Sequence, residues 1–366
     1  MQSIYQENEL CYPQLNSSCK KTMHAPAVSM LIYVTLFLIS LLTVISNLLV
    51  IITVCHFKKL HSPTNILLLS LAVLDCMVGF LISFQIMLID GCWYLGDIMC
   101  SLYFVSDYAI TSASVGTMVL ISVDRYVAIC HPLHYPSKVT AERAKICVIA
   151  CWISSVLFHS LLLRNNLQKP GRYNSCFGEC AVVVDYIGGI FDLLLSFIGP
   201  VTVIIILYVR VFVVVVAQAR AMQSHVADVS LQSSVSVTAK KSEMKAAVIL
   251  GVVVVVFLIC TCPYYCVTLM AEDDGVSASS VAFLLFYFNS TLNPLIYALF
   301  YPWFRKSVKL IVTLQILKQG SVQSISIERS MTQPKGCQLE EEGAAQSQPD
   351  AVVPEGKQES KPEKRN

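Results

Sequence analysis

The chain has 366 residues, of which 55% are hydrophobic and only 14% are charged, and its formal net charge is +2. A soluble domain carries about 25% charged residues, so this composition argues against a soluble globular protein. The near-neutral charge, without any block of lysine and arginine, argues against a nucleic-acid partner, and no nucleophile–base pair or metal-binding motif indicates an enzyme.

Seven stretches of the chain are apolar for long enough to cross a bilayer as helices, which takes roughly 20 residues. Lipid cannot satisfy backbone polar groups, so each crossing segment must be helical and we expect an all-α membrane protein. The predicted spans are 28–54, 64–89, 98–129, 144–163, 186–217, 246–271 and 276–301. They define an N-terminal segment 1–27, a seven-helix bundle 28–301, a short membrane-parallel helix 302–315 and a polar tail 316–366, which we expect to be disordered.

The charges between the spans predict the orientation of the chain. Lysine and arginine occur between spans one and two, three and four, and five and six, and again after span seven. The positive-inside rule places these segments in the cytoplasm and the N-terminus outside the cell, with the chain in the plasma membrane. Asn16 begins an Asn-Ser-Ser glycosylation sequon on the outer side, in agreement. A second sequon, at Asn289, falls inside span seven and should not be modified.

Three aspartates stand inside the apolar spans, and no lysine or arginine shares their stretches: Asp75, Asp107 and Asp192. A carboxylate at membrane depth costs about 2.5–3.5 kcal/mol on insertion scales, so such residues usually have a function. Anions without a cation in the same stretch predict a positively charged ligand. The alternative for Asp107 is that it packs between helices and bonds a neighbour such as Tyr287.

Several cysteines are expected on the oxidising outer face, where they can pair. Cys100 opens span three, and Cys176 and Cys180 lie in the loop before span five. Our preferred bridge joins Cys100 to Cys180 and fixes this loop over the mouth of the bundle. We expect Cys176 to pair with Cys19 rather than Cys11, although spacing does not decide connectivity.

Two motifs lie near the inner ends of spans three and seven. The first is Asp124-Arg125-Tyr126, followed by VAICHPLHY, and the second is Asn293-Pro294-Leu295-Ile296-Tyr297. Together they resemble the motifs of rhodopsin-like G-protein-coupled receptors. The other landmark residues of that family have counterparts here at Asn47, Asp75, Trp152, Pro200 and Pro263.

A narrower resemblance is found in three segments. The stretch 289–304, NSTLNPLIYALFYPWF, is similar to the signature of trace amine-associated receptors, as are CYPQLNSSCKK and CWYLGDIMC. This resemblance implies a receptor that binds a small cationic amine and signals through a heterotrimeric G protein. It also implies the stimulatory or olfactory type of G protein, which raises cAMP.

The predicted ligand site lies between Asp107 and Asp192. Asp107 follows Cys100 by seven residues, which is about 10 Å along a helix, and the resemblance implies that it pairs with the ligand ammonium. Asp192 stands eight residues before Pro200. Spans three and five are neighbours in this fold, so the two carboxylates should flank one cavity and suit a diamine. The resemblance to fish olfactory members with acidic residues on both helices implies a diamine such as cadaverine or putrescine. The alternative is that Asp192 faces another helix or water and that the ligand is a monoamine or polyamine.

Helical spacing adds further walls to this cavity. Thr111 lies one turn below Asp107, and Ser196 lies one turn below Asp192. Two aromatic rings at Tyr264 and Tyr265 offer faces for an alkyl chain or a cation, with plain packing as the alternative. Tyr287 is expected to donate a hydrogen bond to Asp107 and orient it.

The motif at the inner end of span three predicts a switch. Glu243 precedes Pro263 by twenty residues, about 30 Å along span six, so it should reach Arg125 and hold spans three and six together in the inactive state. The alternative is a solvated charge. The resemblance implies that other residues rearrange on activation, namely Val115, Pro200, Tyr208, Phe257 and Tyr297.

The resemblance also implies a sodium site near mid-membrane. Asp75 is its centre, and the expected neighbours are Asn47, Ser114, Asn289 and Asn293. Hard oxygen donors suit a hard cation, so sodium is expected as an allosteric ligand, and no other metal or cofactor is expected.

Two positions depart from the family pattern. Thr261 stands two residues before Pro263, where these receptors usually have tryptophan, and Leu284 replaces another common tryptophan. We therefore expect a roomier pocket floor and an altered link between ligand and switch. A cation transporter or channel is the alternative from another class, but no inverted repeat or pair of broken helices supports it.

Overall fold

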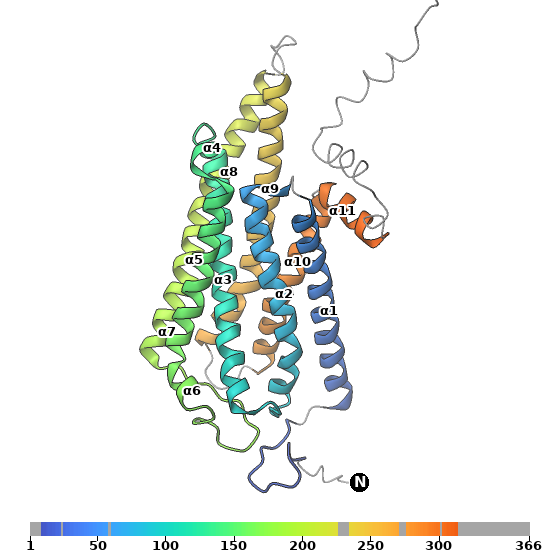
Figure 1. The fold of residues 1–366 in the computed structure, drawn as a ribbon, viewed down its shortest axis with the longest axis vertical. Coiled ribbons are helices and arrows are strands. Elements are labelled where there is room, and N and C mark those ends of the chain that lie inside the picture. Colours follow the sequence, from blue (N-terminus) through green and yellow to red (C-terminus); the bar gives the residue numbers. More distant parts are fainter. Residues whose placement is uncertain are drawn as a thin grey trace, which may run out of the picture. The chain divides into compact units, whose positions relative to one another are not determined.

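The computed structural model describes residues 9–22, 25–57, 60–225, 234–270, 276–300 and 302–313 of the chain. Its helices, shown in Figure 1, are α1 (Pro26–His56), α2 (Pro63–Ile89), α3 (Gly96–Cys130), α4 (Tyr135–Lys138), α5 (Ala141–Leu162), α6 (Arg164–Gln168), α7 (Tyr186–Asp192), α8 (Gly199–His225), α9 (Ser234–Met270), α10 (Val276–Phe300) and α11 (Pro302–Val312). A π-helical segment, Leu193–Ile198, joins α7 to α8. The part of the chain that is described contains isolated β-bridges but no strand, so the fold is all-α as predicted. The predicted tail lies outside the described residues.

Seven helical segments of the described chain are long and apolar enough to cross a membrane, in agreement with the seven predicted spans. They are α1, α2, α3, α5, the continuous run from α7 to α8, α9 and α10. Their outer faces expose large apolar side chains, for example Leu31 at 66%, Ile149 at 57% and Phe212 at 68%. Soluble proteins rarely expose so much apolar surface to water, and contact with lipid avoids the free-energy cost of hydrating it. The chain is therefore a multi-pass membrane protein.

The third span is the centre of the bundle. Helix α3 packs against α2, α5, α8 and α9. Val115, Met118 and Ile121 of α3 are almost fully buried in a core that also holds Leu71 of α2 and Leu250 of α9. A residue on α3 can therefore face several spans at once, which is why its polar residues can take part in more than one site.

The fifth span is irregular where it approaches the predicted ligand site. The segment Leu193–Ile198 is π-helical and ends just before Pro200, whose ring nitrogen cannot donate to the preceding turn. A Cβ atom on Gly199 would lie 2.9 Å from the carbonyl oxygen of Leu194, so the backbone approaches closely here. Such π-helical turns are rare and often occur at functional sites. This one lies between Asp192 and α8.

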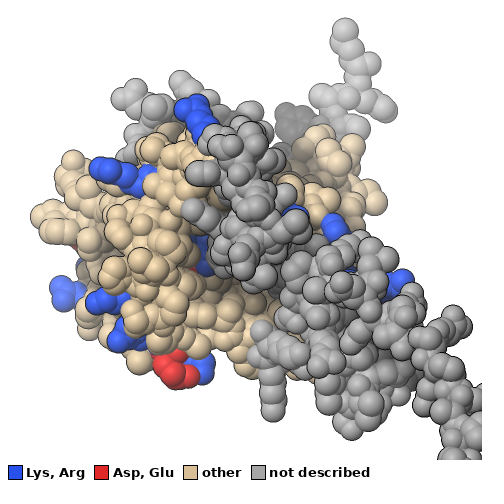
Figure 2. Space-filling model, turned by 90° about the horizontal axis from the view of Figure 1, so that it is seen from above, with Lys and Arg blue, Asp and Glu red and all other residues tan. Residues whose placement is uncertain are grey.

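The end of the bundle that carries α4 and α11 is basic. Figure 2 views the molecule from this end and shows lysine and arginine side chains spread over the described surface. Among the described residues, the exposed basic side chains at this end include Lys138, Arg143, Lys145, Arg220, Lys245, Arg305, Lys306 and Lys309. Helix α11 is amphipathic, because Phe304 is buried while Arg305 is exposed.

Candidate functional site

A cavity of about 400 Å³ opens among α3, α5, the α7–α8 run, α9 and α10. The structure brings all seven predicted ligand-site residues to its wall, namely Asp107, Thr111, Asp192, Ser196, Tyr264, Tyr265 and Tyr287. The remaining lining residues are Tyr108, Ser112, His159, Val184, Asp185, Tyr186, Gly189, Ile190, Leu193, Phe283 and Phe286. Its volume lies within the usual range for small-molecule sites, about 300–1,000 Å³.

Asp107 is partly buried on α3 and faces this cavity. Among the described residues no hydrogen bond or ion pair reaches its carboxylate. The expected bond from Tyr287 is not formed. The Tyr287 hydroxyl instead donates to the side-chain oxygen of Gln85 at 3.3 Å, which also accepts from Tyr103 at 2.8 Å. The Tyr287 hydroxyl is thus bonded to the Gln85 side chain on α2, and the Asp107 carboxylate remains available to a ligand in the cavity.

Asp192 has a different environment. Its Oδ1 atom accepts a hydrogen bond from the Ser196 hydroxyl at 2.8 Å and lies 3.1 Å from Nε2 of His159. The Asp192 side chain is 18% exposed, and His159 is 1% exposed. Neither contact involves Oδ2. The second carboxylate therefore lines the same cavity as the first, but with one of its oxygens already bonded.

His159 was not predicted from the sequence as a site residue. It lies on α5, outside the stretches that contain the three aspartates, and a histidine is neutral unless it is protonated. A signal was present, because His159 is the only basic side chain between Lys145 and Arg164. In the structure α5 buries few residues, and His159 is one of them, beside Ser155.

The aromatic walls of the cavity are packed against each other. Tyr265 stacks on Phe197 with ring centroids 3.8 Å apart. Tyr264 contacts Tyr265 at 5.2 Å and Phe286 at 4.9 Å. On α3, Tyr108 lies 5.8 Å from the His159 ring. These rings are therefore fixed by packing and also present apolar faces to the cavity.

A second cavity of about 30 Å³ lies near the buried side chain of Asp75. Ser114, Asn289 and Thr261 also line it. Asn293 lies beside this group, because its Nδ2 donates to Oδ2 of Asp75 at 2.9 Å. Thr111 and Phe286 line both this cavity and the larger one, so the two share walls.

The predicted neighbours of Asp75 do not all bond to it. Asn47 donates its Nδ2 to the carbonyl oxygens of Thr43 and Ser290, each at 3.0 Å. Three buried oxygens near the small cavity have no hydrogen-bond partner among the described groups, and they belong to Ser114, Asn289 and Asn293. Free oxygens beside a buried carboxylate are what a small hard cation requires.

At the opposite end of α3, Asp124 and Arg125 form a buried ion pair. The guanidinium of Arg125 donates to Oδ2 of Asp124 through Nη2 at 2.6 Å and Nε at 2.9 Å. The same carboxylate accepts from Thr64 at 2.8 Å and from Tyr135 at 2.8 Å. Burial, together with the charge of Asp124, raises the pKa of Tyr135 to about 12, so its hydroxyl remains a donor at neutral pH.

The other switch residues are only partly placed. Phe257 and Tyr297 are buried in the central core, and Tyr208 packs against it. Tyr126 of α3 packs against a separate cluster that includes Ile129 and Val211, and its hydroxyl lies 3.4 Å from Nε2 of His131. Glu243 is on α9, but its side chain lies outside the described residues, so the Arg125–Glu243 pair stays a prediction.

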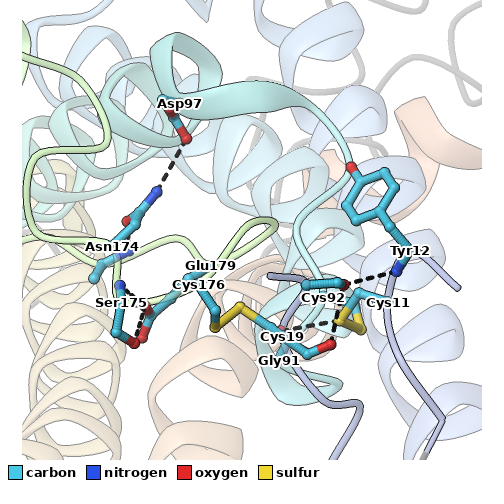
Figure 3. Close-up of a disulfide and its surroundings, with 12 residues drawn as sticks. Cys11, Tyr12, Cys19, Gly91, Cys92, Asp97, Asn174, Ser175, Cys176 and Glu179 are labelled. Carbon is cyan, nitrogen blue, oxygen red and sulfur yellow. Dashed lines mark hydrogen bonds between the residues drawn. A yellow bond between two sulfur atoms is a disulfide. The ribbon is translucent and has the colours of Figure 1, made fainter. Parts of the chain in front are cut away.

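In the described part of the chain, three disulfides connect the loops at the Asp107 end of the bundle. They join Cys19 to Cys176, Cys100 to Cys180 and Cys11 to Cys92. Figure 3 shows how the first and third bring the N-terminal segment against two loops. The first two are the pairings that we preferred, whereas Cys11–Cys92 was not foreseen.

Hydrogen bonds reinforce the same layer. Asn174 donates to Asp97 at 3.0 Å, and Ser175 donates its hydroxyl to Glu179 at 2.7 Å, which lowers the pKa of Glu179 (Figure 3). Asn16 is exposed in this layer, whereas Asn289 is buried in α10.

Comparison with known proteins identifies the family. The pattern described as 7 transmembrane receptor (rhodopsin family) matches residues 46–297. Trace amine-associated receptor 8a of Rattus norvegicus is 39% identical over 86% of this chain and 95% of its own length. Trace amine-associated receptor 13c of Danio rerio is 36% identical over 87% of this chain and 96% of its own length. Trace amine-associated receptor 6 of Pan troglodytes is 37% identical, with 86% and 94% covered. The chain therefore belongs to the rhodopsin family of seven-transmembrane receptors and, within it, to the trace amine-associated receptors.

Proposed function

We propose that the protein is a receptor for cationic amines and that its preferred ligand is a diamine whose ammonium groups bind Asp107 and Asp192. Binding is coupled through a stimulatory or olfactory G protein to a rise in cAMP. The observation that carries this proposal is the carboxylate of Asp107, which faces the cavity without a described protein partner.

Membership of this family implies a small-molecule ligand and a heterotrimeric G protein. It sets aside the transporter and the enzyme as alternatives. The name of the relatives, trace amine-associated receptor, supports an amine as the ligand. The assignment of a stimulatory G protein is based on the resemblance of residues 289–304 to the signature of trace amine-associated receptors.

The electrostatics of Asp107 favour an ammonium group. A cation about 4 Å from a carboxylate gains about 4 kcal/mol at an effective dielectric constant near 20. Desolvation of the two charges offsets part of this gain. The tyrosine rings at Tyr264 and Tyr265 add faces that attract a cation or cover an alkyl chain.

A diamine is favoured because Asp192 lines the same cavity. Both of its described contacts, from Ser196 and His159, fall on Oδ1. Oδ2 is therefore left to accept from a second ammonium. A monoamine at Asp107 would make no use of this atom.

The orientation of the receptor is supported by chemistry at both ends. The three disulfides all lie at the Asp107 end, together with exposed Asn16. Disulfides persist in the oxidising space outside the cell. The basic residues gather at the other end, as on a cytoplasmic face. The cavity therefore faces outward in the plasma membrane.

Sodium is proposed as an allosteric ligand at Asp75. The small cavity, the buried carboxylate and the free oxygens of Ser114 and Asn289 fit a hard cation. Replacing sodium chloride by potassium chloride at constant ionic strength should raise agonist potency in the wild type and leave Asp75→Asn unchanged. Equal agonist potency of the wild type in both salts would contradict a sodium site at Asp75.

A monoamine receptor is the second candidate, because His159 is placed to neutralise Asp192. The two candidates differ in cells that report cAMP after 1,5-diaminopentane or pentylamine. Asp192→Ala should weaken the diamine at least about 25-fold, because losing one partner of a buried charge pair costs about 2–5 kcal/mol. Its effect on pentylamine should be small. Asp97→Ala, at an exposed carboxylate outside the cavity, is the control. Unchanged diamine potency in Asp192→Ala would favour the monoamine receptor.

A further inference from the structure

The contact between His159 and Asp192 requires a proton. Nδ1 of His159 lies 2.8 Å from the carbonyl oxygen of Ser155. A carbonyl can only accept, so Nδ1 carries a hydrogen and donates it. Nε2 lies 3.1 Å from Oδ1 of Asp192. An unprotonated ring nitrogen and an ionised carboxylate are both acceptors, so this second bond needs one further proton, held on either atom.

We infer that a ligand ammonium binds at Asp192 by replacing the proton that His159 and Asp192 share. This inference rests on the proposed diamine function. With the shared proton the pair is neutral overall. When the ammonium enters, the proton leaves to water, and an ionised carboxylate and a neutral imidazole remain. Oδ1, Oδ2 and the lone pair on Nε2 then all accept hydrogen bonds from the ammonium.

Charge balance separates the two classes of ligand. A diamine carries two positive charges, which match the anions of Asp107 and of deprotonated Asp192. A monoamine carries one charge, which Asp107 alone matches, so the shared proton can stay. The diamine therefore releases one proton on binding, and the monoamine releases none. His159 acts as a positioning residue that makes the choice between ligands depend on pH.

Other titratable groups face this pair and must be distinguished from it. They are the other titratable residues that line the cavity, namely Asp107 and Tyr108 on α3, Asp185 and Tyr186 at the start of α7, Tyr264 and Tyr265 on α9, and Tyr287 on α10. Phenols ordinarily titrate near about pH 10, as do alkyl ammonium groups, so neither changes charge between pH 6 and 8. Asp185 caps α7 by accepting from the amide of Gly188 at 2.9 Å. Both ligands bind Asp107 through an ammonium group, so a change in its protonation alters both potencies equally. The ratio of the two potencies is therefore independent of that change.

The test measures cAMP potency of 1,5-diaminopentane and pentylamine at external pH values from 6 to 8. In the wild type the ratio of diamine to monoamine potency should rise with pH by up to about tenfold per unit, because one proton is exchanged. His159→Gln places an amide donor that does not titrate beside Asp192, so its ratio should be independent of pH. His56→Gln, at an exposed histidine on α1, should keep the wild-type slope.

Two results would overturn the inference while the diamine proposal survives. One is a wild-type ratio that is constant across this pH range, with diamine potency still lost in Asp192→Asn. The other is an unchanged slope in His159→Gln. If the His159→Gln variant is not expressed at the cell surface, two other measurements still test the inference. The ratio of diamine to monoamine potency should rise with pH in the wild type and be independent of pH in Asp192→Asn. If the two amines are equipotent at every pH and Asp192→Asn changes nothing, the proposed function itself fails.

Discussion

Asp107 and Asp192 lie on the wall of one cavity, but only one of them has described partners. Asp192 is held through Oδ1 by Ser196 and His159, whereas the described chain offers Asp107 none. The carboxylate of Asp107 is thus open to any cation that enters, whereas that of Asp192 already has two described partners. We propose that this difference lets the cavity distinguish a diamine from a monoamine.

The buried Asp124 carboxylate, which pairs with Arg125, also accepts a hydrogen bond from the Tyr135 hydroxyl. Tyr135→Phe removes one donor from the Asp124 carboxylate. A buried acceptor that loses its donor costs about 1–3 kcal/mol. We expect this arrangement to be destabilised and ligand-independent cAMP to rise in cells matched for surface expression. Tyr94→Phe, at an exposed tyrosine, is the control. Wild-type basal cAMP in Tyr135→Phe would show that this donor does not hold the inactive state.

Seven of the cavity residues could be predicted from the sequence, by helical spacing together with the arrangement of spans that the family resemblance implies. His159 was missed and Tyr287 was given the wrong partner because both contacts depend on how helices rotate about their axes. His159 meets Asp192 only when α5 turns that face inward, and Tyr287 meets Gln85 across α2 and α10. Such rotations are set by packing between helices, which spacing within one helix does not determine.

The π-helical segment of the fifth span is the element that positions Asp192 and Ser196. Gly199→Ala would put a methyl group 2.9 Å from the Leu194 carbonyl oxygen. Backbone must move to relieve this contact, at a cost of about 1–3 kcal/mol. We expect a lower unfolding temperature and weaker diamine potency.

The control for this element is Gly189→Ala on α7, where an added methyl group meets nothing within 4 Å. Its unfolding temperature should equal or exceed that of the wild type, because alanine favours a helix. If Gly199→Ala and the wild type unfold at the same temperature, the π-helical segment tolerates the methyl group and the close backbone approach at Gly199 does not constrain the fifth span.

At the scale of the whole bundle, the three disulfides of the described chain link the N-terminal segment and two loops over the cavity end. Sequence spacing left their connectivity open, and the Cys11–Cys92 bridge joins residues 81 positions apart. Its formation depends on where the N-terminal segment lies, and the sequence contains no local signal for that placement. Most helical spans, by contrast, were predicted within a few residues, since apolar length is a local property. The exception is α9, which begins at Ser234 rather than at the predicted residue 246.

We expect the Cys11→Ser, Cys92→Ser double variant to unfold at a lower temperature than the wild type. Removing a native disulfide typically costs about 2–5 kcal/mol. Cys147→Ser, at an exposed free thiol, is the matched control and should unfold as the wild type does. If the double variant and the control have the same unfolding temperature, the bridge does not contribute to stability.

The central claim is that two anions in one cavity bind the two ends of one ligand. The most direct measurement is cAMP potency for linear alkyl diamines of increasing chain length, each compared with the monoamine of equal length. A two-anion site predicts a bell-shaped dependence on the spacing of the amino groups, with an optimum that disappears in Asp192→Asn. Potency that is flat across chain length, and equal for diamines and monoamines, would contradict it.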